Sequence, residues 1–170
     1  MNRTTKAFDT KRITMTALLA ALALIFSYIE VILPFNTGIP GVKLGIANLV
    51  IIVALYYLGT GYAFSVNLIR VLIAGLLFNG LFGALYSLAG ALLSFAVMTL
   101  LKRTGLFSVT GVSIAGGVSH NLGQLFVAAF LISNLKIFAY FPVLIFSGII
   151  SGAFIGIVSY LILKRLPKIM

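Results

Sequence analysis

The run VLIAGLLFNGLFGALYSLAGALLSFAVMTLL, residues 71–101, contains no charged side chain. A helix needs about 20 apolar residues to cross the roughly 30 Å hydrocarbon core of a bilayer, so this run is long enough for a crossing. Three further charge-free runs are of similar length: 44–69, 104–135 and 137–163. These runs are continuous, whereas strands of a membrane barrel alternate apolar and polar residues. The chain is therefore predicted to be an all-α integral membrane protein.

Composition supports this fold class. The chain has 170 residues, 62% of them hydrophobic and only 8% charged, against about a quarter charged in an average soluble domain. It has no cysteine, which excludes disulfides, cysteine-ligated zinc and thiol catalysis.

The net charge of +10 does not indicate nucleic-acid binding, because the basic residues gather at the ends of apolar segments. This pattern is typical of cytoplasmic loops under the positive-inside rule. With the N-terminus in the cytoplasm, the expected topology places only Lys43 and Lys136 outside. The inside residues are Arg3, Lys6, Lys11, Arg12, Lys102, Arg103, Lys164, Arg165 and Lys168.

Proline, glycine and asparagine divide the chain into six expected membrane helices. They cover about 13–33, 42–58, 62–78, 83–101, 110–133 and 141–163. An irregular loop, 34–41, follows the first helix, which we interpret as retained and not as a cleaved signal peptide. We expect a cytoplasmic tail (1–12), one membrane domain (13–163) and a second cytoplasmic tail (164–170), in a multi-pass protein of the cell membrane.

The stretch GGVSHNLGQ, residues 116–124, places polar side chains deep in an apolar segment. At 100° per residue, His120, Asn121 and Gln124 share one helix face, with Gly116 and Gly117 on the same arc. Three polar groups on one face favour the wall of a polar cavity, in which the glycines make room for a ligand or a neighbouring helix. Structural hydrogen bonding between helices is the alternative.

Arg70 lies near the middle of an expected span, where an arginine costs at least about 2.5 kcal/mol and needs an interior partner. Asn67 shares its face. Glu30 is the only acidic candidate inside the bundle, and it pairs with either Arg70 or Lys43. If Lys43 takes Glu30, Arg70 is left to bind a carboxylate or phosphate ligand.

Lys43 and Asn48 begin the second expected helix. A helix N-terminus beside a lysine favours an anion, so these residues are candidates for the outer part of the same pocket. Alternatively, Lys43 extends its charge to the membrane interface.

Small residues recur every four positions on two helices. Gly148, Gly152 and Gly156 form one such ridge, and Ala17 and Ala21 form a small-xxx-small pair on the first helix. Such ridges allow close helix packing in membranes. Two interpretations of these ridges stay open: packing between helices of this chain, and docking of a partner protein.

Catalytic motifs are missing from the sequence. It has no P-loop, no aspartate-rich pair to hold magnesium, and no second histidine or cysteine to make a metal site with His120. We expect a protein that is not an enzyme and that carries no metal or cofactor.

Three stretches resemble a known membrane family: IPGVKLGIANLVIIVALYYLG (39–59), SLAGALLS (87–94) and GGVSHNLGQL (116–125). The family is labelled "Gx transporter" or "heptaprenyl diphosphate synthase component I", and the resemblance covers nearly the whole chain. It is in turn similar to the S components of energy-coupling factor (ECF) transporters, six-helix proteins with both termini inside and a loop over an external pocket.

The resemblance implies a vitamin-like or precursor substrate, and energy supplied in trans by a T component and two ATPases. It also implies that Ala17 and Ala21 dock on the coupling subunit.

The leading hypothesis is a substrate-binding S component of an ECF-type importer for a small anionic compound. The expected ligand contacts are Glu30, Lys43, Asn48, Arg70, His120, Asn121 and Gln124. One alternative is a membrane subunit of a quinone or flavin electron-transfer system. Another is an accessory membrane subunit linked to prenyl diphosphate synthesis.

Overall fold

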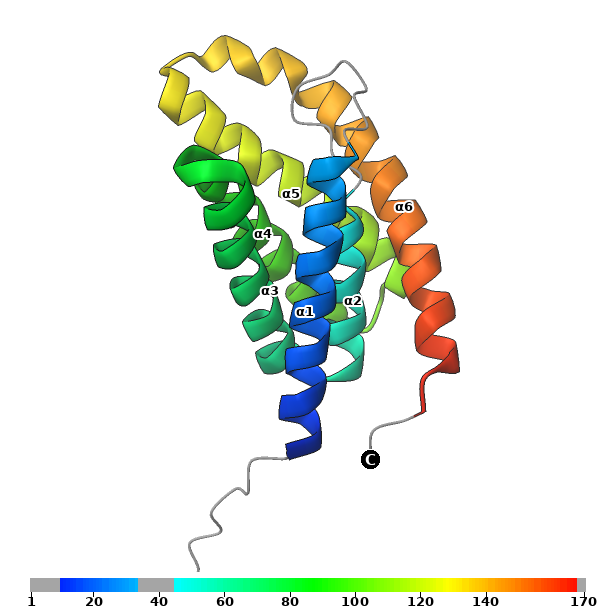
Figure 1. Cartoon of the computed structure of the whole chain (residues 1–170). Coiled ribbons are helices and arrows are strands. Elements are labelled where there is room, and N and C mark those ends of the chain that lie inside the picture. Colours follow the sequence, from blue (N-terminus) through cyan, green and yellow to red (C-terminus); the bar gives the residue numbers. More distant parts are fainter. Residues whose placement is uncertain (1–9, 34–44, 168–170) are drawn as a thin grey trace, which may run out of the picture.

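The computed structural model describes residues 10–33 and 45–167, and in these ranges the secondary structure is entirely helical (Figure 1). The α-helices are α1 (Thr10–Ile32), α2 (Ile46–Tyr57), α3 (Thr60–Ala74), α4 (Gly80–Thr104), α5 (Val109–Ile132) and α6 (Phe141–Arg165). A π-helical turn, η1 (Gly75–Asn79), joins α3 to α4, and a 3₁₀ helix, η2 (Leu135–Tyr140), joins α5 to α6. The predicted all-α membrane fold is confirmed.

Five helical stretches in the described ranges are long and apolar enough to cross a membrane, and α2 is the exception. Its 12 residues span roughly 18 Å at 1.5 Å per residue, less than the roughly 30 Å hydrocarbon core. The expected helix over 42–58 was therefore too long. Gly45 adopts the left-handed conformation (φ 70°) immediately before α2, and a helix does not continue through such a residue.

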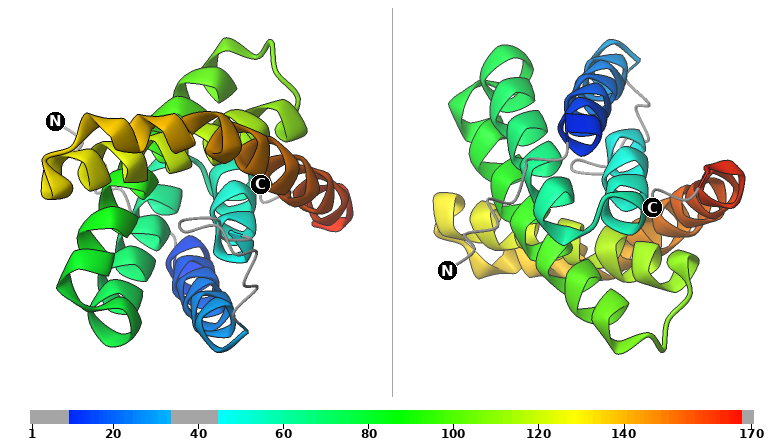
Figure 2. Two further views of the ribbon diagram at one scale, coloured as in Figure 1. Left: turned by 90° about the horizontal axis from the view of Figure 1, so that it is seen from above. Right: turned by 90° about the horizontal axis from the view of Figure 1, so that it is seen from below.

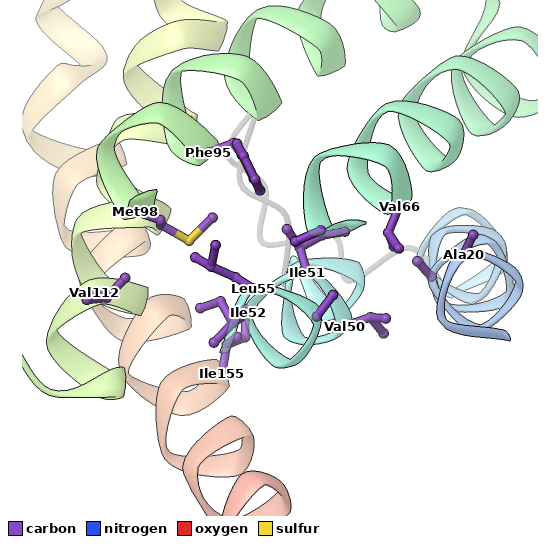
Figure 3. Close-up of a cluster of buried hydrophobic side chains, with 13 residues drawn as sticks. Ala20, Val50, Ile51, Ile52, Leu55, Val66, Phe95, Met98, Val112 and Ile155 are labelled. Carbon is purple, nitrogen blue, oxygen red and sulfur yellow. The ribbon is translucent and has the colours of Figure 1, made fainter. Parts of the chain in front are cut away.

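The short helix α2 lies at the centre of the bundle, between α1, α3 and α6 (Figure 2). Seven of its twelve residues are buried, including Ile51, Ile52 and Leu55. They pack against Ala20 of α1 and other apolar side chains in the cluster shown in Figure 3. A helix that is apolar on all sides is buried in the protein, which explains why α2 does not need the length of a lipid-facing span.

Helix α5 packs closely against α6 through glycine. A Cβ atom added at Gly117 would lie 2.5 Å from the carbonyl oxygen of Gly148, and one at Gly152 would lie 2.7 Å from the Cα atom of Ile114. Gly156 makes an equally close approach to Thr110. The predicted ridge of Gly148, Gly152 and Gly156 therefore packs against α5 within the chain.

The opposite side of α5 packs against α4 in the same way. A Cβ atom at Gly123 would lie 2.8 Å from the carbonyl oxygen of Ala89, and one at Gly116 would lie 2.6 Å from the sulfur of Met98. Thus α5 is held between α4 and α6, with glycines on both sides.

Basic residues gather at one end of the bundle. The first turn of α1 and the last turn of α6 lie at this end (Figure 1), with Lys164 and Arg165 in the latter. Lys102 joins them, because its Nζ atom donates to the carbonyl oxygen of Leu55 at 2.6 Å and lies 5.1 Å from the Tyr56 ring centroid. The lysine thus satisfies a carbonyl in the last turn of α2.

Candidate functional site

A polar cavity lies between the helices, and all six α-helices contribute to its wall. The space in which the centre of a water molecule can move is about 90 Å³, enough for several waters or one small ligand. Glu30 near the end of α1 and Asn48 in the first turn of α2 line the end of the cavity that lies away from the basic end of the bundle. Met98 near the end of α4 and Ser113 near the start of α5 also line it, so the cavity extends toward the basic end.

Arg70 is the cation of this cavity among the described residues that line it. Only 8% of its surface is exposed. Its Nη2 atom donates to the side-chain oxygens of Asn48 at 3.0 Å and Asn67 at 3.1 Å. Both partners are neutral amides, so the positive charge of the guanidinium is hydrogen-bonded but not neutralised.

Asn67 positions Arg70 and was not among the predicted ligand contacts. It is 3% exposed, and its Nδ2 atom donates to the carbonyl oxygen of Ala91 on α4 at 3.3 Å. One side chain therefore links α3 to α4 and fixes the orientation of the arginine. The spacing of three residues between Asn67 and Arg70 was the sequence signal for this contact.

Among the described residues, Glu30 does not hydrogen-bond to Arg70, one of the two partners that the sequence suggested for it. Its Oε1 atom accepts a hydrogen bond from the backbone amide of Ile46 at 2.8 Å, which places a carboxylate at the N-terminus of α2, where the helix dipole favours negative charge. The carboxylate attracts the Arg70 guanidinium through space. Lys43, the other expected partner, lies outside the described residues.

His120, Asn121 and Gln124 all line the cavity, as their common helix face predicted. Asn121 also donates from Nδ2 to the carbonyl oxygen of Leu144 on α6 at 2.8 Å, so it serves helix packing as well. Gly90 makes room for the other two, since a Cβ there would lie 3.0 Å from both His120 Cε1 and Gln124 Cγ.

Gly116 and Gly117 belong to the same wall, but the space beside them is filled by neighbouring helices. A Cβ at either position would collide with Met98 of α4 or Gly148 of α6. Of the two roles expected for these glycines, the structure supports close helix packing.

Serine hydroxyls are the part of the site that sequence reasoning missed. Five serines line the cavity: Ser27, Ser87, Ser94, Ser113 and Ser151. Ser113 is 3% exposed, and its Oγ atom has no hydrogen-bond partner in the described ranges. A signal was present, because Ser113 precedes Gly117, His120 and Gln124 at helical spacing along one stripe of α5.

Comparison with protein-family models matches residues 19–162 to the family described as heptaprenyl diphosphate synthase component I. The chain belongs to this family. Comparison with curated proteins and with solved structures gives no match. The description of the family speaks of one component of a synthase, and thus of a protein that works with another component.

The described part of the chain contains no cluster of side chains that could bind a metal ion. No group of three or more histidine, cysteine, aspartate or glutamate side chains comes together there. The described lining of the cavity offers hydrogen bonding through one guanidinium, one carboxylate, one imidazole, and several amides and hydroxyls. This set is suited to binding a small polar ligand.

The two alanines predicted to dock a partner lie on the outer face of α1. Ala17 and Ala21 are exposed, while Ala20 and Ala23 of the same helix are 5% and 0% exposed and pack inward. The geometry leaves Ala17 and Ala21 accessible to another membrane protein, and their docking role remains a prediction.

Proposed function

We propose that this chain is the substrate-binding membrane subunit of an importer of the energy-coupling factor type. It lies in the cell membrane with both termini in the cytoplasm. It captures a small anionic compound, such as a vitamin or an isoprenoid or quinone precursor, from the outside. The observation that carries the proposal is the buried Arg70 in a polar cavity lined by all six α-helices.

The environment of Arg70 supports an anionic ligand. An arginine inside a membrane protein is costly and marks a functional site by default. Here its hydrogen-bond partners are the amides of Asn48 and Asn67, which orient the guanidinium without cancelling its charge. A carboxylate or phosphate group of the ligand then binds the guanidinium through charge-assisted hydrogen bonds.

The position of the cavity supports uptake from the outside. One end of the cavity, lined by Glu30 and Asn48, lies away from the basic residues of α4 and α6. Basic clusters face the cytoplasm under the positive-inside rule, so this end of the cavity is nearer the external surface.

We further propose that the chain catalyses no reaction itself. Transport then requires energy from outside the chain, and we assign it to a T component and two ATPase subunits. The exposed alanines 17 and 21 on α1 are the proposed contact with the coupling subunit, because small residues permit close helix approach in lipid.

A second function is favoured by the family description. A component of heptaprenyl diphosphate synthase would be a membrane subunit that assists a soluble prenyl synthase. In that case the basic end of the bundle, with Lys102, Arg103, Lys164 and Arg165, would contact the synthase, and the cavity would serve an isoprenoid or quinone precursor.

Affinity purification of the tagged protein from its native membrane, followed by mass spectrometry, tests both functions. Recovery of two ATPases and a T-type membrane protein is the expected result. Recovery of a soluble prenyl synthase without ATPases would replace the importer by the second function. Flavoproteins or dehydrogenases without ATPases would refute both and would favour an electron-transfer subunit.

A further inference from the structure

We propose that the ligand of this cavity is a small zwitterion, with an anionic group held by Arg70 and a protonated amine held by Glu30. This inference rests on the proposed function, because it names the chemical class of the compound that the binding subunit captures. It is carried by the arrangement of the two charged side chains that line the cavity in the described ranges.

The two charges are kept apart by separate anchors. Arg70 is held by the amide oxygens of Asn48 and Asn67 at 3.0 and 3.1 Å. Glu30 is held by the backbone amide of Ile46 at 2.8 Å. Both anchors come from the protein framework, so the cation and the anion face the same cavity without a direct hydrogen bond to each other.

The charges of the side chains that line the cavity indicate the class of ligand. The described lining carries one positive and one negative side chain, Arg70 and Glu30. A simple anion opposes only the charge of Arg70 and offers no cation to the carboxylate of Glu30. Uncompensated charge is expensive in a low-dielectric interior. A zwitterion gives each of these two side chains an opposite charge.

The carboxylate of Glu30 retains acceptor capacity for the amine. Its contact with Ile46 uses Oε1, and a carboxylate accepts about four hydrogen bonds through its two oxygens. Polar groups without charge, among them Ser94, Ser113 and Gln124, line the same space and suit the neutral part of the ligand. The volume of about 90 Å³ open to water centres limits that part to a few heavy atoms.

The test uses matched pairs of small probes on the purified full-length protein in detergent. Glycine, β-alanine and γ-aminobutyrate are zwitterions with increasing charge separation. Each is compared with the carboxylate in which a methyl group replaces the ammonium group: propionate, butyrate and valerate. Inorganic pyrophosphate and methylamine complete the panel. The shift in thermal unfolding temperature and the apparent Kd are measured for each probe at constant ionic strength.

At least one zwitterion is expected to bind ten-fold or more tightly than its matched carboxylate. Glu30→Gln should abolish this preference, because the glutamine oxygen still accepts from Ile46 but carries no charge. Asp9→Asn makes the same change at the only other acidic position of the chain, and we expect it to leave the preference unchanged.

Failure of the inference and failure of the proposed function give different results. If propionate, butyrate, valerate or pyrophosphate binds as tightly as the zwitterions, and Glu30→Gln changes nothing, the zwitterion is refuted while an anion-binding subunit stands. If no probe binds to the wild-type protein, the zwitterion is refuted, and the partners recovered by affinity purification decide the proposed function. If Glu30→Gln does not fold, the comparison of matched probes on the wild-type protein decides alone.

Discussion

At the scale of single residues, the charge of the cavity depends on Asn48. Its side-chain oxygen lies 3.0 Å from the Nη2 atom of Arg70, and the residue itself lines the cavity. An amide at this position orients the arginine and leaves its charge available. A carboxylate would orient the arginine equally well but would neutralise its charge. The side chain at position 48 therefore determines whether Arg70 is available to a ligand or is held in an internal ion pair.

We therefore predict that Asn48→Asp lowers the affinity for anionic and zwitterionic probes at least ten-fold while the protein still folds. The hydrogen bond to Arg70 is retained and becomes charge-assisted, but the guanidinium no longer needs an anion from the ligand. Probe titration and thermal unfolding in detergent measure the two effects.

Asn134→Asp is the matched control for this substitution. Its side-chain oxygen accepts a hydrogen bond from the amide of Lys136 at 2.9 Å in an exposed turn, which aspartate also accepts. Unchanged binding by Asn48→Asp would show that Arg70 does not carry the ligand.

Cavity residues could be predicted from the sequence where a polar or charged side chain is energetically costly inside a membrane. Arg70 and the polar face of α5 stand out against an apolar sequence, and both line the cavity. The serines were missed because a serine can satisfy its hydroxyl on its own helix, as Ser27 does by donating to the carbonyl oxygen of Ala23 at 2.9 Å. The partner of Glu30 was also missed, because a backbone amide carries no signal in the sequence.

At the scale of helices, the close contact between α5 and α6 depends on Gly117. We predict that Gly117→Ala destabilises the protein by about 1–3 kcal/mol, because the added methyl group requires the helices to separate. Its Cβ would lie 2.5 Å from the carbonyl oxygen of Gly148, a backbone atom that has no alternative rotamer. Thermal or denaturant unfolding in detergent measures the change.

Gly61→Ala is the matched control, since a Cβ at this position meets nothing within 4 Å. Alanine is favoured over glycine in a helix, so its stability should be equal or slightly higher. Equal stability for both variants would mean that the α5–α6 contact yields easily and that the glycines are not needed for packing.

Helix number and order were predictable from the charge-free runs together with the proline, glycine and asparagine residues that divide them, and helix ends were less so. The turn at Asn79–Gly80 was expected, and Gly80 has a positive φ of 66°. The π-helical turn before it, Gly75–Asn79, has no local pattern that distinguishes it from α-helix. The length of α2 was overestimated because burial by other helices, not contact with lipid, explains its apolar sequence.

At the scale of the whole molecule, substitutions on the outer face of α1 distinguish docking of a partner from folding of the subunit. We predict that Ala17→Leu abolishes uptake by the assembled transporter and leaves ligand binding by the isolated subunit unchanged. Ala17 is exposed, so a larger side chain there meets a partner and not the core. Uptake of radiolabelled ligand by proteoliposomes and probe binding in detergent are the two measurements.

Ala20→Leu is the comparison, because Ala20 is 5% exposed and belongs to the core cluster. We expect it to reduce stability and to impair binding and uptake together. If Ala17→Leu also lost binding, the residue would be part of the fold and the docking surface would have to lie elsewhere.

The two ends of the bundle differ in charge, and this difference predicts the orientation of the protein. Leu106, between α4 and α5, is 84% exposed near the basic end. Lys136 is exposed in η2, which joins α5 to α6 at the opposite end. Because the chain has no cysteine, Leu106→Cys and Lys136→Cys each give a protein with a single reactive thiol.

We predict that a membrane-impermeant maleimide labels Lys136→Cys in intact cells, and that it labels Leu106→Cys only after the membrane is permeabilised. The reason is that the positive-inside rule places the ends of α4 and α6 in the cytoplasm, and therefore places η2 and the end of the cavity at Glu30 and Asn48 toward the outside. Labelling in the reverse order would put the cavity on the cytoplasmic side. The binding site would then face the wrong compartment for capture, and an importer would no longer be tenable even if Arg70 bound an anion.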